Sequence, residues 1–290
     1  MNTVLALICA SAFSLNSLSI RFFQLKLMRV SRDVKLFQFL FCAVASCAYM
    51  LAGGFVFTLT PRDILLAASF GILFAVCILA SAECYVCGPM SVTSVIMNSS
   101  VVVPVIYSCA VLHESISVTQ IIGLMLLIAT FVILSGGSKK SNGISARWFI
   151  LVLISFFANG STAVIQKVYK LSAAPGGGYD FMGVAYAIAA LAVFAAFAAD
   201  KRKAESGKGF SSAPLFVVLV LVAGLGSFCG NGMLLNLSTV MPASLLYPLM
   251  NGALCIIVAA VSLLVFREKV TPRKLSAIAC GLGAIIVLNL

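Results

Sequence analysis

The chain has 290 residues, of which 62% are hydrophobic and only 9% are charged, whereas an ordinary soluble domain carries about 25% charged residues. A globule with this composition could not cover its surface with polar groups, so the composition excludes a water-soluble domain and predicts a multi-pass protein of the cell membrane. The net charge of +11 does not indicate nucleic-acid binding, because the Lys and Arg residues stand between apolar segments and not on one solvated face.

Apolar segments broken by charged or turn residues predict ten membrane-spanning helices. A span of roughly 30 Å takes about 20 apolar residues, so ten spans use almost the whole chain. The expected spans are 2–20, 36–57, 64–86, 90–112, 118–136, 147–166, 181–199, 214–237, 243–265 and 273–290. No basic residue precedes the first span, since the first charge is Arg21, and we therefore expect this span to remain as a helix and not to be cleaved as a signal peptide.

The ten cysteines lie inside apolar segments or at their edges, where free cysteines behave as small buried hydrophobic residues. Cys84-x-x-Cys87 resembles half of a metal or redox motif. However, the chain has a single His and no second Cys pair nearby, so a zinc or redox site lacks ligands. We expect no metal and no cofactor.

The sequence contains an internal repeat, a common feature of transporter folds. An offset of 153 residues aligns small and polar positions in the two halves, namely Gly71 with Gly224, Pro89 with Pro242, Ser91 with Ser244, and Met97-Asn98 with Met250-Asn251. The first span aligns with the sixth at an offset of 143, which pairs Asn16 with Asn159. The long polar loop 200–212 accounts for the difference between the two offsets.

The repeat divides the chain into residues 1–138 and residues 144–290, each with five spans. Because five is odd, the second half enters the membrane from the opposite side, and the repeats are inverted. Inverted repeats place a substrate site near the middle of the bilayer and give two alternately open conformations.

The basic residues predict the orientation. All but Arg62, Lys167 and Lys170 of the 19 Lys and Arg fall in the connections after the first, fifth, seventh and ninth spans. Connections kept in the cytoplasm are enriched in Lys and Arg. We therefore predict that these connections are cytoplasmic and that both termini lie outside.

The chain resembles, over its full length, the ten-helix EamA-type transporters of the drug/metabolite transporter superfamily. The resemblance rests on the duplicated halves and on the motifs Glu114 with Gln120-Ile121-Ile122-Gly123, and Phe266-Arg267-Glu268-Lys269 with Pro272 and Gly281. The second copy departs from the pattern, with Ala277 at the position of Gly123. The resemblance implies a secondary transporter that exports its solute through a cavity lined by spans 1, 3, 4, 6, 8 and 9, with spans 5 and 10 at the periphery.

Polar side chains inside spans are candidate substrate ligands, because they are costly in a bilayer. Asn98 and Asn251 form one repeat-related pair and Asn16 and Asn159 another. The remaining candidates are Asn231 and Tyr247. Hydrogen bonding between helices is the alternative role for all six.

Two prolines and one acid add to these candidates. Pro248 and Pro104 each remove a backbone donor from a span, and would free the carbonyls of residues 244 and 100 as packing or gating features. Glu83 is an acid within an apolar segment, so it is a candidate for proton or cation coupling. Its alternative role is an interfacial pairing with Arg.

We therefore expect a secondary transporter that moves a small metabolite or drug-like solute by alternating access. Alternatives are an uptake permease for a sugar or vitamin and a non-transporting membrane scaffold. An enzyme is not expected, because His113 beside Glu114 does not amount to clustered acid, base or metal groups. The expected partners are the solute, the lipid bilayer and a coupling proton or ion. The spacing Ala277-x-x-x-Gly281 would suit a homodimer as well as packing within one chain.

Overall fold

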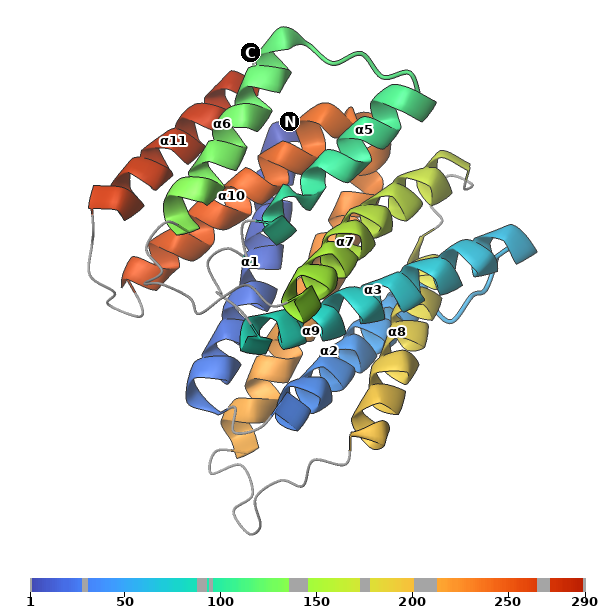
Figure 1. Ribbon diagram of the computed structural model, residues 1–290. Coiled ribbons are helices and arrows are strands. Elements are labelled where there is room, and N and C mark those ends of the chain that lie inside the picture. Colours follow the sequence, from blue (N-terminus) through green and yellow to red (C-terminus); the bar gives the residue numbers. More distant parts are fainter. Residues whose placement is uncertain are drawn as a thin grey trace.

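The computed structural model describes residues 2–27, 31–87, 93, 96–135, 146–172, 178–200, 213–264 and 272–288. In this part of the chain all regular structure is helical (Figure 1). The elements are α1 (Asn2–Lys26), α2 (Ser31–Ala52), α3 (Pro61–Cys87), the 3₁₀ turn η1 (Ser99–Val101), α5 (Val102–Val111), α6 (Val118–Ser135), α7 (Ala146–Ser172), α8 (Tyr179–Ala199), α9 (Ala213–Val240), α10 (Ala243–Leu264) and α11 (Pro272–Leu288). Pro89, Ser91 and Glu268, which carry part of the repeat and of the resemblance, lie outside the described residues.

Within the described residues, six helices are long and apolar enough to cross a membrane: α1, α2, α3, α7, α8 and α9. Shorter apolar helices cover Ile96–Val111, Val118–Thr130 and Ala243–Ile257. Large apolar side chains on the outer surface, such as Leu65, Val118 and Leu191, are about two-thirds exposed. Such a surface suits hydrocarbon better than water, and helices satisfy their own backbone hydrogen bonds there. The chain is therefore a multi-pass, all-helical membrane protein.

Pro104 and Pro248 differ in their effect on the helices that contain them. η1 immediately precedes α5, and Pro104 is the third residue of α5, a position where its missing N–H costs little. The break expected near residue 100 therefore takes the form of a tightened 3₁₀ turn. α10, in contrast, runs through Pro248 without interruption.

The helices pack through contacts between distant parts of the sequence. α1 packs against α9 and α10, α2 against α8 and α9, and α3 against α7 and α8. One apolar core joins α1, α2 and α9 through the rings of Phe23, Phe37 and Phe216, whose centroids lie 4.5–6.0 Å apart. The same core continues into α3 and α8, where the Tyr186 ring lies 5.2 Å from the ring of Phe74.

α6 and α11 lie side by side at the edge of the bundle (Figure 1). The residues of α6 that are buried, Gly123, Leu127 and Thr130, form one narrow stripe. A Cβ atom added to Gly281 of α11 would lie 3.2 Å from Thr130 and 3.4 Å from Ile256. The small residue of the proposed dimer motif is therefore used for packing within one chain.

Two glycines, Gly71 and Gly224, make similar close contacts with neighbouring helices. A Cβ atom on Gly71 of α3 would collide with the backbone oxygen of Ala185 in α8 and lie 3.0 Å from Cβ of Ile188. A Cβ atom on Gly224 of α9 would lie 3.0 Å from the backbone oxygen of Phe41 in α2 and 2.5 Å from Cγ1 of Val44. The sequence aligns Gly71 with Gly224, whereas Phe41 and Val44 lie 144 residues before Ala185 and Ile188, one residue more than the offset of 143 that aligns the first span with the sixth. Similar glycine contacts therefore occur at the two interfaces.

The two sides of the bundle can be defined from the helix directions. α1 and α9 are antiparallel, because Cys9 Sγ donates to Gly230 O at 3.0 Å whereas Asn16, further along α1, donates to Ala223 O at 2.9 Å. We call the side on which α1 begins and α9 ends the N-terminal side, and the other the opposite side. Figure 1 shows the start of α1 and the end of α11 both toward the top of the view.

Candidate functional site

Two of the predicted ligands, Asn16 and Asn231, form hydrogen bonds between helices. Asn16 on α1 donates from Nδ2 to Ser227 Oγ on α9 at 2.8 Å, as well as to Ala223 O. Asn231, which is buried in α9, accepts from Gln166 Nε2 on α7 at 2.8 Å and donates to Tyr186 Oη on α8 at 2.8 Å. The Asn231 amide therefore links three helices, and both side chains have polar partners within the protein.

Asn159 and Tyr247 form hydrogen bonds that join α7 to η1 and to α10. Asn159 on α7 is exposed, and its Nδ2 donates to Ser100 Oγ in η1 at 2.7 Å. Tyr247 on α10 is buried, and its hydroxyl donates to the backbone oxygen of Ala163 on α7 at 2.9 Å. α7 is thus bonded to both η1 and α10.

The repeat-related pair Asn98 and Asn251 is half-buried. Asn251 Nδ2 donates to the backbone oxygen of Tyr247 one turn earlier in its own helix at 3.0 Å. Asn98 directly precedes η1, and its side chain does not cap that turn. No hydrogen bond among the described residues joins Asn98 to Asn251, so the substrate-binding role of this pair stays a prediction.

Glu83 lies near the end of α3, where its carboxylate is 3.5 Å from the guanidinium of Arg147 at the start of α7. The Arg147 side chain is 68% exposed and that of Glu83 is 20% exposed. This geometry is the interfacial pairing with Arg that was the alternative to a coupling role. The coupling role of Glu83 stays a prediction.

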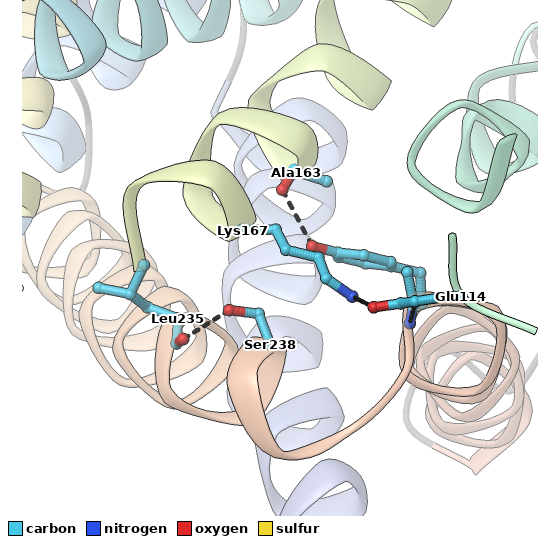
Figure 2. Close-up of polar contacts among 7 residues, drawn as sticks. Glu114, Ala163, Lys167, Leu235 and Ser238 are labelled. Atoms are coloured by element: carbon cyan, nitrogen blue, oxygen red, sulfur yellow. Dashed lines mark hydrogen bonds and ion pairs between the residues drawn. The ribbon is translucent and has the colours of Figure 1, made fainter. Parts of the chain in front are cut away.

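An ion pair between Glu114 and Lys167 was missed by the sequence analysis (Figure 2). One Glu114 oxygen accepts from Lys167 Nζ, and the other accepts from the backbone N–H of Ala243 at 2.8 Å. Glu114 follows α5, Lys167 belongs to α7, and Ala243 is the first residue of α10. A single carboxylate therefore holds three chain segments together on the N-terminal side.

The expectation that Lys167 lies in the connection after the sixth span is wrong. α7 continues to Ser172, and the Lys167 side chain is only 2% exposed. An unpaired ammonium at such a position would be very costly, and the Glu114 carboxylate offsets this cost. The signal in the sequence was the match of Glu114 to Glu268, which marked Glu114 as a repeated position but gave no indication of its partner.

Several cysteines pack inside apolar clusters, whereas Cys47 and Cys229 are exposed. All ten are free thiols, and Cys84 and Cys87 belong to an apolar cluster with Trp148 and Val152. Among the residues that the structure describes, no group of three His, Cys, Asp or Glu side chains is placed to hold a metal ion. The polar chemistry of the described residues thus consists of amides, hydroxyls and a few ion pairs.

No family model matches the chain, and no curated protein matches it. A solved structure described only as "Crystal structure of protein" is similar over 99% of this chain and 94% of its own, with a TM-score of 0.70 and 13% sequence identity. At this identity the similarity shows a shared fold and leaves the function open.

Proposed function

We propose that the protein is a secondary transporter which moves a small metabolite or drug-like solute across the membrane by alternating access. The observation that carries this proposal is the repeated glycine contact. Gly71 packs on α8 in the same way as its repeat partner Gly224 packs on α2. In the proposed topology the two halves begin on different sides of the membrane, and inverted repeats of this kind characterise secondary transporters.

The arrangement of the other helices supports the same proposal. The contact of α1 with α9 has its repeat equivalent in the contact of α7 with α3, and the contact of α3 with α8 in that of α9 with α2. α2 and α8, which are repeat partners, contact each other, as do α6 and α11. Such a pattern is expected if ten spans form two inverted five-helix repeats around an in-membrane axis.

The finer parts of the proposal rest on the sequence. We propose membership of the EamA-type group, export as the direction, and a transport function without enzymatic activity. The peripheral position of α6 and α11 supports the first of these, because the resemblance places spans 5 and 10 at the edge. A coupling proton or ion and a homodimer are further proposals.

The first experiment is thermal unfolding of the purified protein with a panel of amino acids, sugars, vitamins and cationic drugs. A ligand that binds only the folded state raises the melting temperature, by an amount equivalent to about 2.7 kcal/mol at one hundred times its Kd. We expect one chemical class to stabilise the protein. Solutes of that class are then tested for flux into proteoliposomes, with protein-free liposomes as the control.

A non-transporting scaffold is the second candidate, and one observation favours it. The amides of Asn16 and Asn231 are bonded to neighbouring helices, as they would be if they served only to hold the bundle together. The double variant Asn98→Ala/Asn251→Ala separates the two candidates, with Asn236→Ala as the control because Asn236 is exposed and bonds only within its own helix. A fully folded double variant without flux supports transport, whereas loss of folding supports the scaffold.

A further inference from the structure

We propose that the Glu114–Lys167 ion pair is a latch that keeps the N-terminal side of the transporter closed in this conformation. The proposal rests on the proposed function, since a latch has a role only if the two sides open in turn. It assigns a conformational role to two residues that are not candidate substrate ligands. Three features carry it: the segments that the pair joins, the difference between the two halves, and the buried polar atoms near the pair.

The pair joins segments that a transporter would have to separate in order to open. Lys167 stands in the last turns of α7, and Glu114 reaches both Lys167 and the first N–H of α10. One residue earlier in α7, Gln166 donates to Asn231 on α9. The end of α7 is thus tied at adjacent positions to Glu114 and to α9. It cannot move away from either without losing these bonds.

The two halves of the chain differ in one contact between helices, although most of their other helix contacts correspond. α7 packs against α9, whereas their repeat equivalents, α1 and α3, make no comparable contact in the part of the chain that the structure describes. Near the end of α1, Phe23 packs on α2 and α9, and near the end of α3, Cys84 packs on α7. In an alternating-access transporter, a contact made by one half and missing in the other distinguishes the closed side from the open side. The closed side here is the N-terminal side.

The repeat places Gln24 of α1 at the position of Lys167 in α7 by the offset of 143. Gln24 carries no charge, so position 24 cannot supply the cation that Lys167 supplies in the second half. At these two aligned positions the sequence is therefore asymmetric. The Glu114–Lys167 latch would bias the transporter toward the conformation that is closed on the N-terminal side.

Polar atoms near the pair lack partners in this conformation. Gln166 Oε1, Ser244 Oγ and Ser108 Oγ are all buried without a hydrogen bond among the described residues. Gln166 and Ser244 are the sequence neighbours of Lys167 and Ala243, and Ser108 O accepts from the Glu114 N–H at 3.1 Å. Buried polar atoms without partners are costly. Water entering from the N-terminal side would satisfy them, so opening would recover part of the free energy lost with the ion pair.

Solvent can reach the latch from one direction. Glu114 lines an open depression together with His113, Ser117, Gln120 and Pro242, and its side chain is 22% exposed. In a buried ion pair the attraction between the charges is largely offset by their desolvation. Hydration of this pair from the depression therefore costs far less than that attraction, which suits a contact that must break in each transport cycle.

The test measures the accessibility of a thiol and needs no substrate. Asn159→Cys on α7 supplies the reporter thiol, because Asn159 lies near the middle of α7 and its amide faces η1, where it donates to Ser100 Oγ at 2.7 Å. A membrane-impermeant thiol reagent is applied to each face of the membrane in turn, and peptide mass spectrometry follows the reporter thiol alone, so the ten native cysteines can remain. The latch is removed by the double variant Glu114→Gln/Lys167→Met, which leaves no unpaired buried charge and keeps an oxygen for the Ala243 N–H.

We expect the reporter thiol to react from the opposite face alone in the otherwise unchanged protein. In the double variant we expect its reaction from the N-terminal face to rise about tenfold or more, the change produced by a shift of about 1.4 kcal/mol. The matched control is Glu83→Gln/Arg147→Met, which removes the ion pair on the opposite side and should leave reaction from the N-terminal face unchanged.

An unchanged rate from the N-terminal face in the folded double variant overturns the latch and leaves the proposed function untouched. An equal rise in the Glu83→Gln/Arg147→Met control also overturns it, because loss of any ion pair would then loosen the bundle. A reporter thiol that reacts from neither face in every variant overturns the aqueous pathway, and with it both the proposed function and the latch.

Discussion

At the scale of single residues, Lys167 is a charged residue that is almost completely buried. Its side chain is 2% exposed and depends on the Glu114 carboxylate for charge compensation. Breaking a buried pair by removing one partner typically costs about 3–5 kcal/mol, whereas replacing both partners by neutral groups costs far less. Stability therefore depends less on the presence of the ion pair than on never leaving one of its two charges buried alone.

We predict that Glu114→Ala destabilises the protein by about 3 kcal/mol or more, because it leaves the Lys167 ammonium buried without a counter-charge. The double variant Glu114→Gln/Lys167→Met should be more stable than this single variant. The measurement is thermal unfolding in detergent. Arg147→Met is the control, since Arg147 is largely exposed and such a pair contributes about 1 kcal/mol at most. A single variant as stable as the double variant would contradict the prediction.

A second prediction concerns Asn231, whose amide bonds to Gln166 and Tyr186. We expect Asn231→Ala to lower the free energy of unfolding by about 0.6 kcal/mol, and by about 1.7 kcal/mol at most, the mean and the maximum measured for hydrogen bonds between membrane helices. Asn236→Ala on the same helix should change it much less, because Asn236 bonds only to Gly232 O. Equal effects of the two substitutions would show that the Asn231 network contributes nothing of its own.

At the scale of elements, the close approach of α3 to α8 and of α9 to α2 depends on glycine. A methyl group on Gly71 or Gly224 would meet backbone atoms, which cannot rotate away as a side chain can. The extra volume is expected to cost about 1–3 kcal/mol, more than the gain of up to about 1 kcal/mol in helix propensity.

We therefore predict that Gly71→Ala and Gly224→Ala each destabilise the protein, and by similar amounts because their contacts are equivalent. Gly283→Ala on α11 is the matched control: a Cβ atom there has no neighbour within 4 Å, so this variant should be neutral or slightly stabilised. Thermal unfolding of the three variants checks the order. A stabilised Gly71→Ala with a destabilised Gly224→Ala would contradict the equivalence of the two halves.

The elements also show what the sequence could and could not predict. Apolar length alone predicted the helices, because each must satisfy its own backbone in lipid, and the described helix ends mostly lie within a few residues of the expected ones. α7 is longer than expected because a charged residue, Lys167, was taken as a solvated end. Its partner Glu114 is 53 residues away in sequence, and no local pattern encodes that contact. The hydrogen-bond partners of Asn16 and Asn231 are also far away in sequence, so no local pattern predicts them.

At the scale of the whole molecule, the latch acquires a direction only when the two sides are assigned to compartments. The distribution of Lys and Arg predicts that both termini, and with them the Glu114–Lys167 pair, lie outside. The latch would then close the outer side, and the conformation of this structure would be the one that receives a solute from the cytoplasm. Export begins from that conformation.

The first reporter is an enzyme that is active only outside the cytoplasm. We predict that it is active when fused after Leu290 and inactive when inserted within the basic loop 200–212. A fluorescent protein that folds only in the cytoplasm should give the reverse result at both positions, which controls for expression. A second experiment removes basic residues, because the orientation of a membrane protein follows the Lys and Arg residues near the ends of its spans. Replacing Lys201, Arg202 and Lys203 by Gln should weaken the preference.

A C-terminus found in the cytoplasm would reverse this orientation and, with it, the direction that the latch implies. The Glu114–Lys167 pair would then close the inner side. The conformation described here would be the one open to the outside, as an uptake permease requires at the start of its cycle. The fusion at Leu290 therefore shows which side of the membrane the latch closes before any substrate is known, because that side follows from the position of the termini.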